Sequence, residues 1–141
     1  MISVNPYLNF KGNTEQAFTF YREVFGGEFT SVIRFRDFPG NSMGVAEADL
    51  DKIAHISLPL GNVLLMANDV ISRPFTQGNH CYLSLQADTP AEAKRIFNAL
   101  CQNGTVEMPL QETEWAELFG TCIDQFGVQW MMNYTGAKTF G

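Results

Sequence analysis

Few side chains in this sequence of 141 residues could take part in acid–base, nucleophilic or metal chemistry. There are two histidines, His55 and His80, and three cysteines at irregular spacing without a CxxC motif. An odd number of such cysteines is typical of reduced, small core side chains. Glutamates gather at Glu112, Glu114 and Glu117. They could form a paired-carboxylate active site, although a solvated acidic turn is the simpler interpretation.

Composition narrows the class of protein. A hydrophobic fraction of 45% with 17% charged residues indicates a single folded domain with a sizeable core. The net charge of −6 and the scattered lysines and arginines argue against nucleic acid or an anionic membrane as a partner. The first ten residues do not look like a signal peptide, and no apolar run is long enough to span a bilayer. We therefore expect a cytoplasmic protein.

Two stretches have the same helical pattern. Thr89, Pro90 and Glu92 are typical of a helix N-terminus and predict a helix over 89–102. Asn13 as the N-cap and Gln16 three residues later mark the start of an equivalent helix, predicted over 13–25. The apolar residues recur with the spacing of one buried stripe, at Ala17, Phe20, Tyr21, Val24 and Phe25 and again at Ala93, Ile96, Phe97, Leu100 and Cys101.

Alternating segments around these helices predict strands. They fall at 3–10, 28–36, 53–58 and 62–67, and then at 80–86, 105–110, 120–124 and 128–134. Residues 37–51 read as a loop, with room for one short strand. The pattern predicts one domain made of two βαβββ modules, about 1–68 and about 80–135, joined by a linker over about 69–79.

Three of the predicted strands have one apolar face and one mixed face. The mixed faces carry amides, hydroxyls, a histidine, aromatics and a methionine, at Asn5, Tyr7 and Asn9, at His80, Tyr82, Ser84 and Gln86, and at Gln129, Met131 and Asn133. Such a face can simply meet water. Its aromatic and methionine content favours a small-molecule pocket instead.

Several motifs along the chain are specific to one family. They are Asn5-Pro6-Tyr7-Leu8, Phe20-Tyr21 through Phe25-Gly26-Gly27, residues 108–115, and Phe119-Gly120 through residues 124–133. In these the chain resembles the vicinal oxygen chelate superfamily (glyoxalase, bleomycin resistance and dioxygenase proteins), and within it the PhnB-like branch. That branch has often carried a demethylubiquinone methyltransferase label, yet the chain has no glycine-rich nucleotide loop after a strand. The resemblance implies an α+β fold, two βαβββ modules forming a cupped, mostly antiparallel sheet, and a homodimer.

Metal enzymes of the superfamily take their ligands from four places, which fall here on Asn5, Leu65, His80 and Met131. Only His80 offers a good donor for a divalent metal, and Asn5 offers a weak one. Leu65 and Met131 cannot replace the carboxylates of the family. We therefore expect no metal or other cofactor, and a lone histidine at a strand start is typical of a structural or pocket residue.

The resemblance also places the turn around Trp115 and Phe119 beside the cavity, where Trp115 is either a stacking lid or a core residue. His55 could enter the same pocket or bridge strands. The predicted ligand-binding residues are thus Asn5, Tyr7, Leu65, His80, Tyr82, Trp115, Phe119 and Met131.

We expect a glyoxalase-like small-molecule-binding protein without the intact metal site of the superfamily. Two alternatives stay open. One is a metal-dependent lyase or isomerase of small carbonyl compounds, with His80 as the anchor. The other is a resistance protein that sequesters a drug across a dimer interface. No residue can be assigned a catalytic role.

Overall fold

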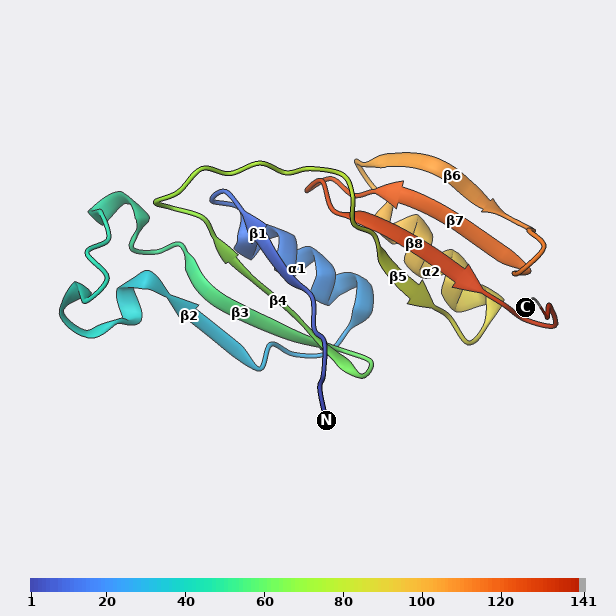
Figure 1. The fold of residues 1–141 in the computed structure, drawn as a ribbon, viewed down its shortest axis with the longest axis horizontal. Helices are drawn as coiled ribbons and strands as arrows, with labels where there is room; N and C mark the ends of the chain where they lie inside the picture. The colour runs from blue at the N-terminus through green and yellow to red at the C-terminus, as the bar shows by residue number, and fades with distance from the viewer. Residues whose placement is uncertain (140–141) are drawn as a thin grey trace. The chain divides into compact units, whose positions relative to one another are not determined.

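The computed structural model describes residues 1–139, which form two compact units (Figure 1). The first unit comprises Met1–Thr76 and the second begins at Gln77, within the segment predicted as the linker. Each unit is one βαβββ module, called module 1 and module 2 below. Neither helix in residues 1–139 is long and apolar enough to cross a membrane.

Module 1 is a four-stranded sheet with one helix on one face. Its elements are β1 (Tyr7–Phe10), α1 (Thr14–Phe25), β2 (Ser31–Arg34), β3 (Ile53–Leu60) and β4 (Val63–Asp69). The strand order is β1-β4-β3-β2, with β1 parallel to β4 and the other pairs antiparallel. The long connection from β2 to β3 contains three short 3₁₀-helical turns, η1 (Phe35–Asp37), η2 (Pro39–Asn41) and η3 (Glu47–Asp49), and no short strand.

Module 2 repeats this arrangement. Its elements are β5 (Leu83–Gln86), α2 (Pro90–Leu100), β6 (Thr105–Gln111), β7 (Leu118–Ile123) and β8 (Gln129–Tyr134), in the order β5-β8-β7-β6. Only the β5–β8 pair of these strands is parallel. The predicted α+β class, the paired βαβββ modules and the mostly antiparallel pairing are therefore confirmed.

The first strand of each module is shorter than predicted, because a side-chain amide replaces the backbone ladder at its start. The Leu64 N–H donates to Asn5 Oδ1 at 2.8 Å, just before β1. Gln129 Nε2 donates to the Cys81 carbonyl at 2.7 Å, just before β5. Asn5, His80 and Tyr82 thus lie in the segments that lead into the strands, and not within them.

Each module has its own core between the helix and one face of its sheet. In module 1 the completely buried side chains include Ala17, Phe18 and Tyr21 of α1 and Leu58, Leu65 and Ala67 of the sheet. In module 2 they include Ala93, Leu100 and Cys122, and Trp130 and Met132 are 1% exposed. Two expectations were wrong here: Phe18 joins the stripe that Phe20 was expected to share, and Cys81 is exposed.

The two helices begin in different ways. Thr89 caps α2 as predicted, since its Oγ1 accepts the Glu92 N–H at 3.1 Å. Asn13 stands at the N-cap of α1 but makes no capping hydrogen bond with its side chain. The carboxylate of Asp69 replaces it, accepting the Thr14 N–H at 3.1 Å and the Thr14 hydroxyl at 2.6 Å. A residue at the end of β4 therefore fixes the start of α1.

Candidate functional site

The face of each sheet opposite its helix is called its open face. Leu65, Ala67 and Asp69 are alternate residues of β4, so their side chains lie on the same face of the sheet. Leu65 and Ala67 are completely buried and Asp69 bonds to Thr14 of α1, so this is the face that packs against the helix. Met66 and Asn68 consequently lie on the open face. Because paired residues on neighbouring strands point to the same side, Tyr7 and Asn9 share the open face with them.

A tyrosine–histidine pair occupies the open face of module 1. The Tyr7 hydroxyl and His55 Nδ1 are 3.2 Å apart, and the ring centroids are 5.7 Å apart. Partial burial raises the pKa of Tyr7 above its usual value. The structure thus places Tyr7 on the predicted face and gives His55 a partner across β4. This pair bridges strands, which is one of the two roles expected for His55.

Leu65 is a correction to the predicted site, because it is completely buried on the helix side of β4. A shift of one residue along a strand is enough to reverse the face to which a side chain points. The hairpin of module 1 closes on the helix side with the pair Leu60–Val63, whereas that of module 2 closes on the open face with Ile123–Gln129. Leu65 and Met131 each lie four residues after the glycine of their hairpin turn, Gly61 or Gly127. Because the two hairpins close on different faces, the two side chains point to opposite sides of their sheets. Leu65 contributes to the core and does not line an open-face site.

Asn5 and His80 also differ from their expected setting. Asn5 Oδ1 is occupied by the Leu64 N–H, so its amide closes the start of β4. His80 is exposed in the bend that precedes β5. The predicted residues of module 2 that do lie on the open face are Phe119 and Met131, as the pairs Phe119–Asn133 and Ser84–Met131 show.

Three of the predicted aromatic site residues of module 2 make specific contacts. Trp115 and Phe119 pack edge to face with ring centroids 5.2 Å apart; Trp115 is 41% exposed and Phe119 is buried. The Tyr82 hydroxyl donates to Glu107 Oε1 at 2.8 Å, and this bond to the carboxylate raises the pKa of Tyr82. Tyr82, from the segment before β5, thus bonds to the opposite edge strand of the same sheet.

The acidic turn of module 2 is not a paired-carboxylate site. Glu112 forms an ion pair with Lys138 at 2.7 Å, and that ammonium lowers the pKa of Glu112. Glu117 Oε2 accepts the backbone N–H of Ala137. Both carboxylates therefore hold the segment that follows β8.

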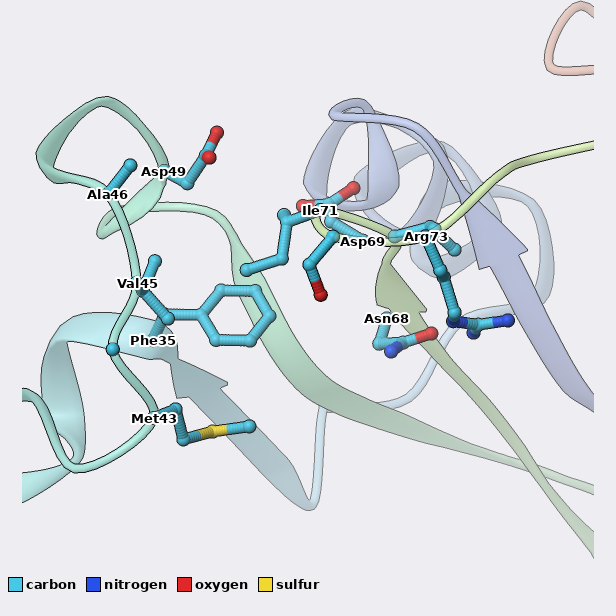
Figure 2. A pocket seen from close by; sticks show the side chains of 12 residues that line it. Phe35, Met43, Val45, Ala46, Asp49, Asn68, Asp69, Ile71 and Arg73 are labelled. Carbon is cyan, nitrogen blue, oxygen red and sulfur yellow. The ribbon is translucent and has the colours of Figure 1, made fainter.

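A cavity of about 420 Å³ lies in module 1 between the β2–β3 connection and the residues that follow β4 (Figure 2). It is lined by Phe35, Met43, Gly44, Val45, Ala46, Asp49, Asn68, Asp69, Val70, Ile71, Ser72 and Arg73. None of these residues was predicted as a site residue. The available signals were the long segment with Pro39, Gly40 and Gly44 between two strands, and Arg73 shortly after a strand.

The lining of the cavity is chemically divided. Phe35 and Ile71 point toward one another across it in Figure 2, with Val45 and Met43 on the same side as Phe35. Asn68 is different, because its buried Oδ1 has no hydrogen-bond partner. An unsatisfied buried acceptor costs roughly 1–3 kcal/mol, so a donor that reached this atom would supply the hydrogen bond that it lacks.

The charged residues of the cavity differ in how fully their own contacts satisfy them. Asp69 accepts four hydrogen bonds, from Gly12, Ile53 and both donors of Thr14. Asp49 pairs with Lys52 at 2.6 Å. Arg73 makes a long hydrogen bond of 3.3 Å, from Nη2 to Asn9 Oδ1. Arg73 is therefore the cavity residue best suited to meet an added anion.

A family model described as 3-demethylubiquinone-9 3-methyltransferase matches residues 3–133 of the chain. The chain belongs to this family. Protein YjdN of Escherichia coli K12 is 33% identical over 137 residues, covering 92% of this chain and 93% of the relative. Among solved structures, protein PA1353 from Pseudomonas aeruginosa is 41% identical with a TM-score of 0.87, covering 95% of this chain and 98% of that one.

Two further solved structures resemble this chain. The PhnB protein from Bacillus cereus, titled a putative 3-demethylubiquinone-9 3-methyltransferase, is 26% identical with a TM-score of 0.77, covering 94% of this chain and 99% of that one. The fosfomycin resistance protein FosX from Listeria monocytogenes shares the fold at 10% identity and a TM-score of 0.63, covering 94% and 93%. The predicted resemblance to PhnB-like proteins is therefore confirmed, and the likeness to FosX shows a shared fold.

The metal positions of the vicinal oxygen chelate superfamily do not form a fitting donor set in this PhnB-like chain. A catalytic divalent metal generally takes about three imidazole, thiolate or carboxylate ligands. Here Asn5 Oδ1 is already bonded to Leu64, Leu65 is buried in the core, and Met131 brings only a thioether. Within residues 1–139 no group of three or more histidine, cysteine, aspartate or glutamate side chains could hold a metal ion.

Proposed function

We propose that this protein binds a small, partly apolar organic molecule in the cavity of module 1, without a tightly held divalent metal. The observation that carries the proposal is a cavity of about 420 Å³ whose lining includes Asn68, a residue with a buried and unpartnered Oδ1. Ligand pockets of small molecules typically have this size, with an apolar lining and a few placed polar groups.

The donor chemistry favours binding without a metal over the metal-dependent lyase or isomerase. That alternative needs His80 as an anchor together with carboxylates, and the corresponding positions carry Leu65 and Met131. A cation beside these apolar side chains would lose hydration without gaining ligands, which is costly.

The description of the matching family names a methyltransferase, and we do not extend this activity to the chain. The two strand-to-helix connections, residues 11–13 and residues 87–89, contain one glycine between them. Glycine-rich loops that hold a nucleotide cofactor lie at this place in other folds. We propose, as the family resemblance implies, that the binding form is a homodimer, which light scattering of the purified protein at micromolar concentration would test.

The proposal is tested by filling the cavity. Ile71→Trp places an indole in the cavity, and Val106→Trp places the same group on the exposed edge strand β6 as a matched control. A fragment library of aromatic and aliphatic compounds is screened by ligand-observed NMR against both variants and the unmodified protein, with circular dichroism to verify folding. Fragments that bind the unmodified protein and Val106→Trp, but not Ile71→Trp, support the proposal.

Three results would contradict it. Equal binding of every fragment to both variants would place the site elsewhere. Elemental analysis that finds about one divalent metal per chain, lost in His80→Ala, would favour the metal-dependent lyase or isomerase. A ligand stoichiometry of one per two chains would favour the second alternative, a resistance protein that sequesters a drug across a dimer interface.

A further inference from the structure

The cavity of module 1 has a polar end where β1 and β4 finish side by side. Asn9 and Asn68 are paired residues of these parallel strands, so their side chains leave the same face of the sheet. Arg73 follows four residues after β4 and bonds to Asn9. Figure 2 shows the Asn68 side chain extending toward Arg73. The Asn68 amide and the Arg73 guanidinium therefore lie at this end of the cavity, and Asn9, which is not part of the lining, holds Arg73 from outside.

We propose that this polar end recognises a small monocarboxylate that carries a hydroxyl or N–H donor beside the carboxylate, with an apolar group on the opposite wall. This inference rests on the proposed function, since it names the class of molecule that the same cavity takes. Each part of the ligand follows from a different feature of the wall.

The carboxylate follows from Arg73. A guanidinium presents donors in a planar fork that matches a carboxylate, and charge-assisted bonds are shorter and stronger than neutral ones. The bond from Arg73 to Asn9 is 3.3 Å long and goes to a neutral amide, so a carboxylate can replace it with a net gain.

The single charge follows from the other side chains. Asp49 and Asp69 also line the cavity, and both are bonded to donors of their own. Arg73 is the one positively charged residue among the described residues of the lining, so a single positive charge is available to balance an incoming anion. A dianion such as a phosphate monoester would carry an excess charge toward these carboxylates. The cavity therefore favours a monoanion.

The hydrogen-bond donor follows from Asn68. Its buried Oδ1 accepts no hydrogen bond, and a carboxylate cannot supply one because it only accepts. Once a turn of the Asn68 side chain exposes this oxygen, a hydroxyl or N–H group next to the carboxylate would reach it while the carboxylate reaches Arg73. The apolar remainder of such a ligand would lie against Phe35, Val45 and Ile71.

Three related probes separate these parts. 3-Phenyllactate has the anion, the hydroxyl and an apolar ring; 3-phenylpropanoate lacks the hydroxyl; 3-phenylpropane-1,2-diol lacks the anion. We expect 3-phenyllactate to bind best in NMR titrations, with each of the other two weaker by roughly tenfold, the value of one good polar contact.

Two variants assign these preferences to residues. Arg73→Gln should abolish the advantage of 3-phenyllactate over the diol, and Asn68→Leu should abolish its advantage over 3-phenylpropanoate. Lys94→Gln, an exposed cation of α2, is the control and should change neither ratio. Because Asn68→Leu also removes an unsatisfied acceptor, its urea midpoint should be equal to or above that of the unmodified protein, which keeps unfolding from explaining lost selectivity.

The outcomes distinguish this inference from the proposed function. If fragments bind in the cavity but the three probes bind equally well, or the variants leave the ratios unchanged, the inference is wrong and the proposed function stands. If neither fragments nor probes bind, both are wrong. A crystal structure with 3-phenyllactate that shows only a water on Asn68 Oδ1, and no ligand hydroxyl, would also overturn the inference.

Discussion

Module 1 and module 2 share the same order of elements but fix their helices by different means. In module 2, Thr89 and Pro90 start α2 from within the helix's own sequence. In module 1, the Asp69 carboxylate reaches from the last strand to the first turn of α1, and it also accepts the N–H groups of Gly12 and Ile53. One side chain thus joins the helix, the loop before it and β3.

The connections between the second and third strands also differ. In module 2, six residues, 112–117, join β6 to β7; in module 1, residues 35–52 join β2 to β3. The cavity lies beside this longer connection, which supplies Phe35, Met43, Val45 and Asp49 to its lining. A repeated architecture fixes the strands and helices, and the variable connection supplies the site.

The largest difference between the modules should appear on removal of Asp69. Asp69→Ala leaves three backbone N–H groups and the Thr14 hydroxyl without their acceptor in a buried place, and we expect a loss of about 3 kcal/mol in the free energy of unfolding. Urea unfolding followed by circular dichroism measures it. Asp51→Ala, at an exposed aspartate of the same module, is the control and should change little.

Tryptophan fluorescence sharpens this experiment, since Trp115 and Trp130 both lie in module 2. The circular dichroism transition of Asp69→Ala should move to lower urea than the fluorescence transition if the modules unfold separately. A loss for Asp69→Ala no larger than that for Thr89→Ala would refute the central role of Asp69.

The helix caps give a smaller contrast. Thr89→Ala removes the hydrogen bond to the Glu92 N–H and should cost about 1 kcal/mol. Asn13→Ala should cost close to nothing, because the Asn13 side chain makes no capping bond. Urea midpoints of the two variants test this; equal losses would contradict the different capping of α1 and α2.

The sequence predicted both helices and the strand pattern because these depend on local spacing. Thr89 and its helix could be recognised from four consecutive residues. Asp69 could not, since it lies 55 residues from Thr14 and nothing local marks a carboxylate as the cap of a distant helix. The same limit explains why the capping assigned to Asn13 was wrong.

The predicted site shows where alternation is a sufficient guide and where it fails. Period-two spacing placed Tyr7 and Met131 on the open faces, where the structure has them. Leu65 was placed from the family resemblance, and because the hairpin of module 1 closes on the helix side, its side chain lies on the opposite face from Met131. The cavity depends on how residues 35–49 fold back toward residues 68–73, which no periodicity reports.

The smallest effect concerns the first turns of the two helices. Glu15 of α1 pairs with Arg34 through two hydrogen bonds of 3.0 and 2.6 Å, and this bond lowers the pKa of Glu15. The Glu15 side chain is 55% exposed, so solvent screens the pair. Glu92 also lies in the first turn of its helix, as the third residue of α2 where Glu15 is the second residue of α1. At pH 7, Glu15→Gln should therefore cost about 0.5 kcal/mol more than Glu92→Gln.

The pH dependence of this difference has a definite sign. Because folding lowers the pKa of Glu15, its pair with Arg34 stabilises the protein above the unfolded-state pKa of about 4.3. The contribution is lost as the pH falls through the lower folded-state pKa. Unfolding of both variants in urea at pH 7 and near pH 3 should show the difference shrinking in acid, and also in 1 M salt at pH 7. A difference that persists in acid would mean that Glu15 stabilises α1 through packing, and the contrast between the two first turns would not be electrostatic.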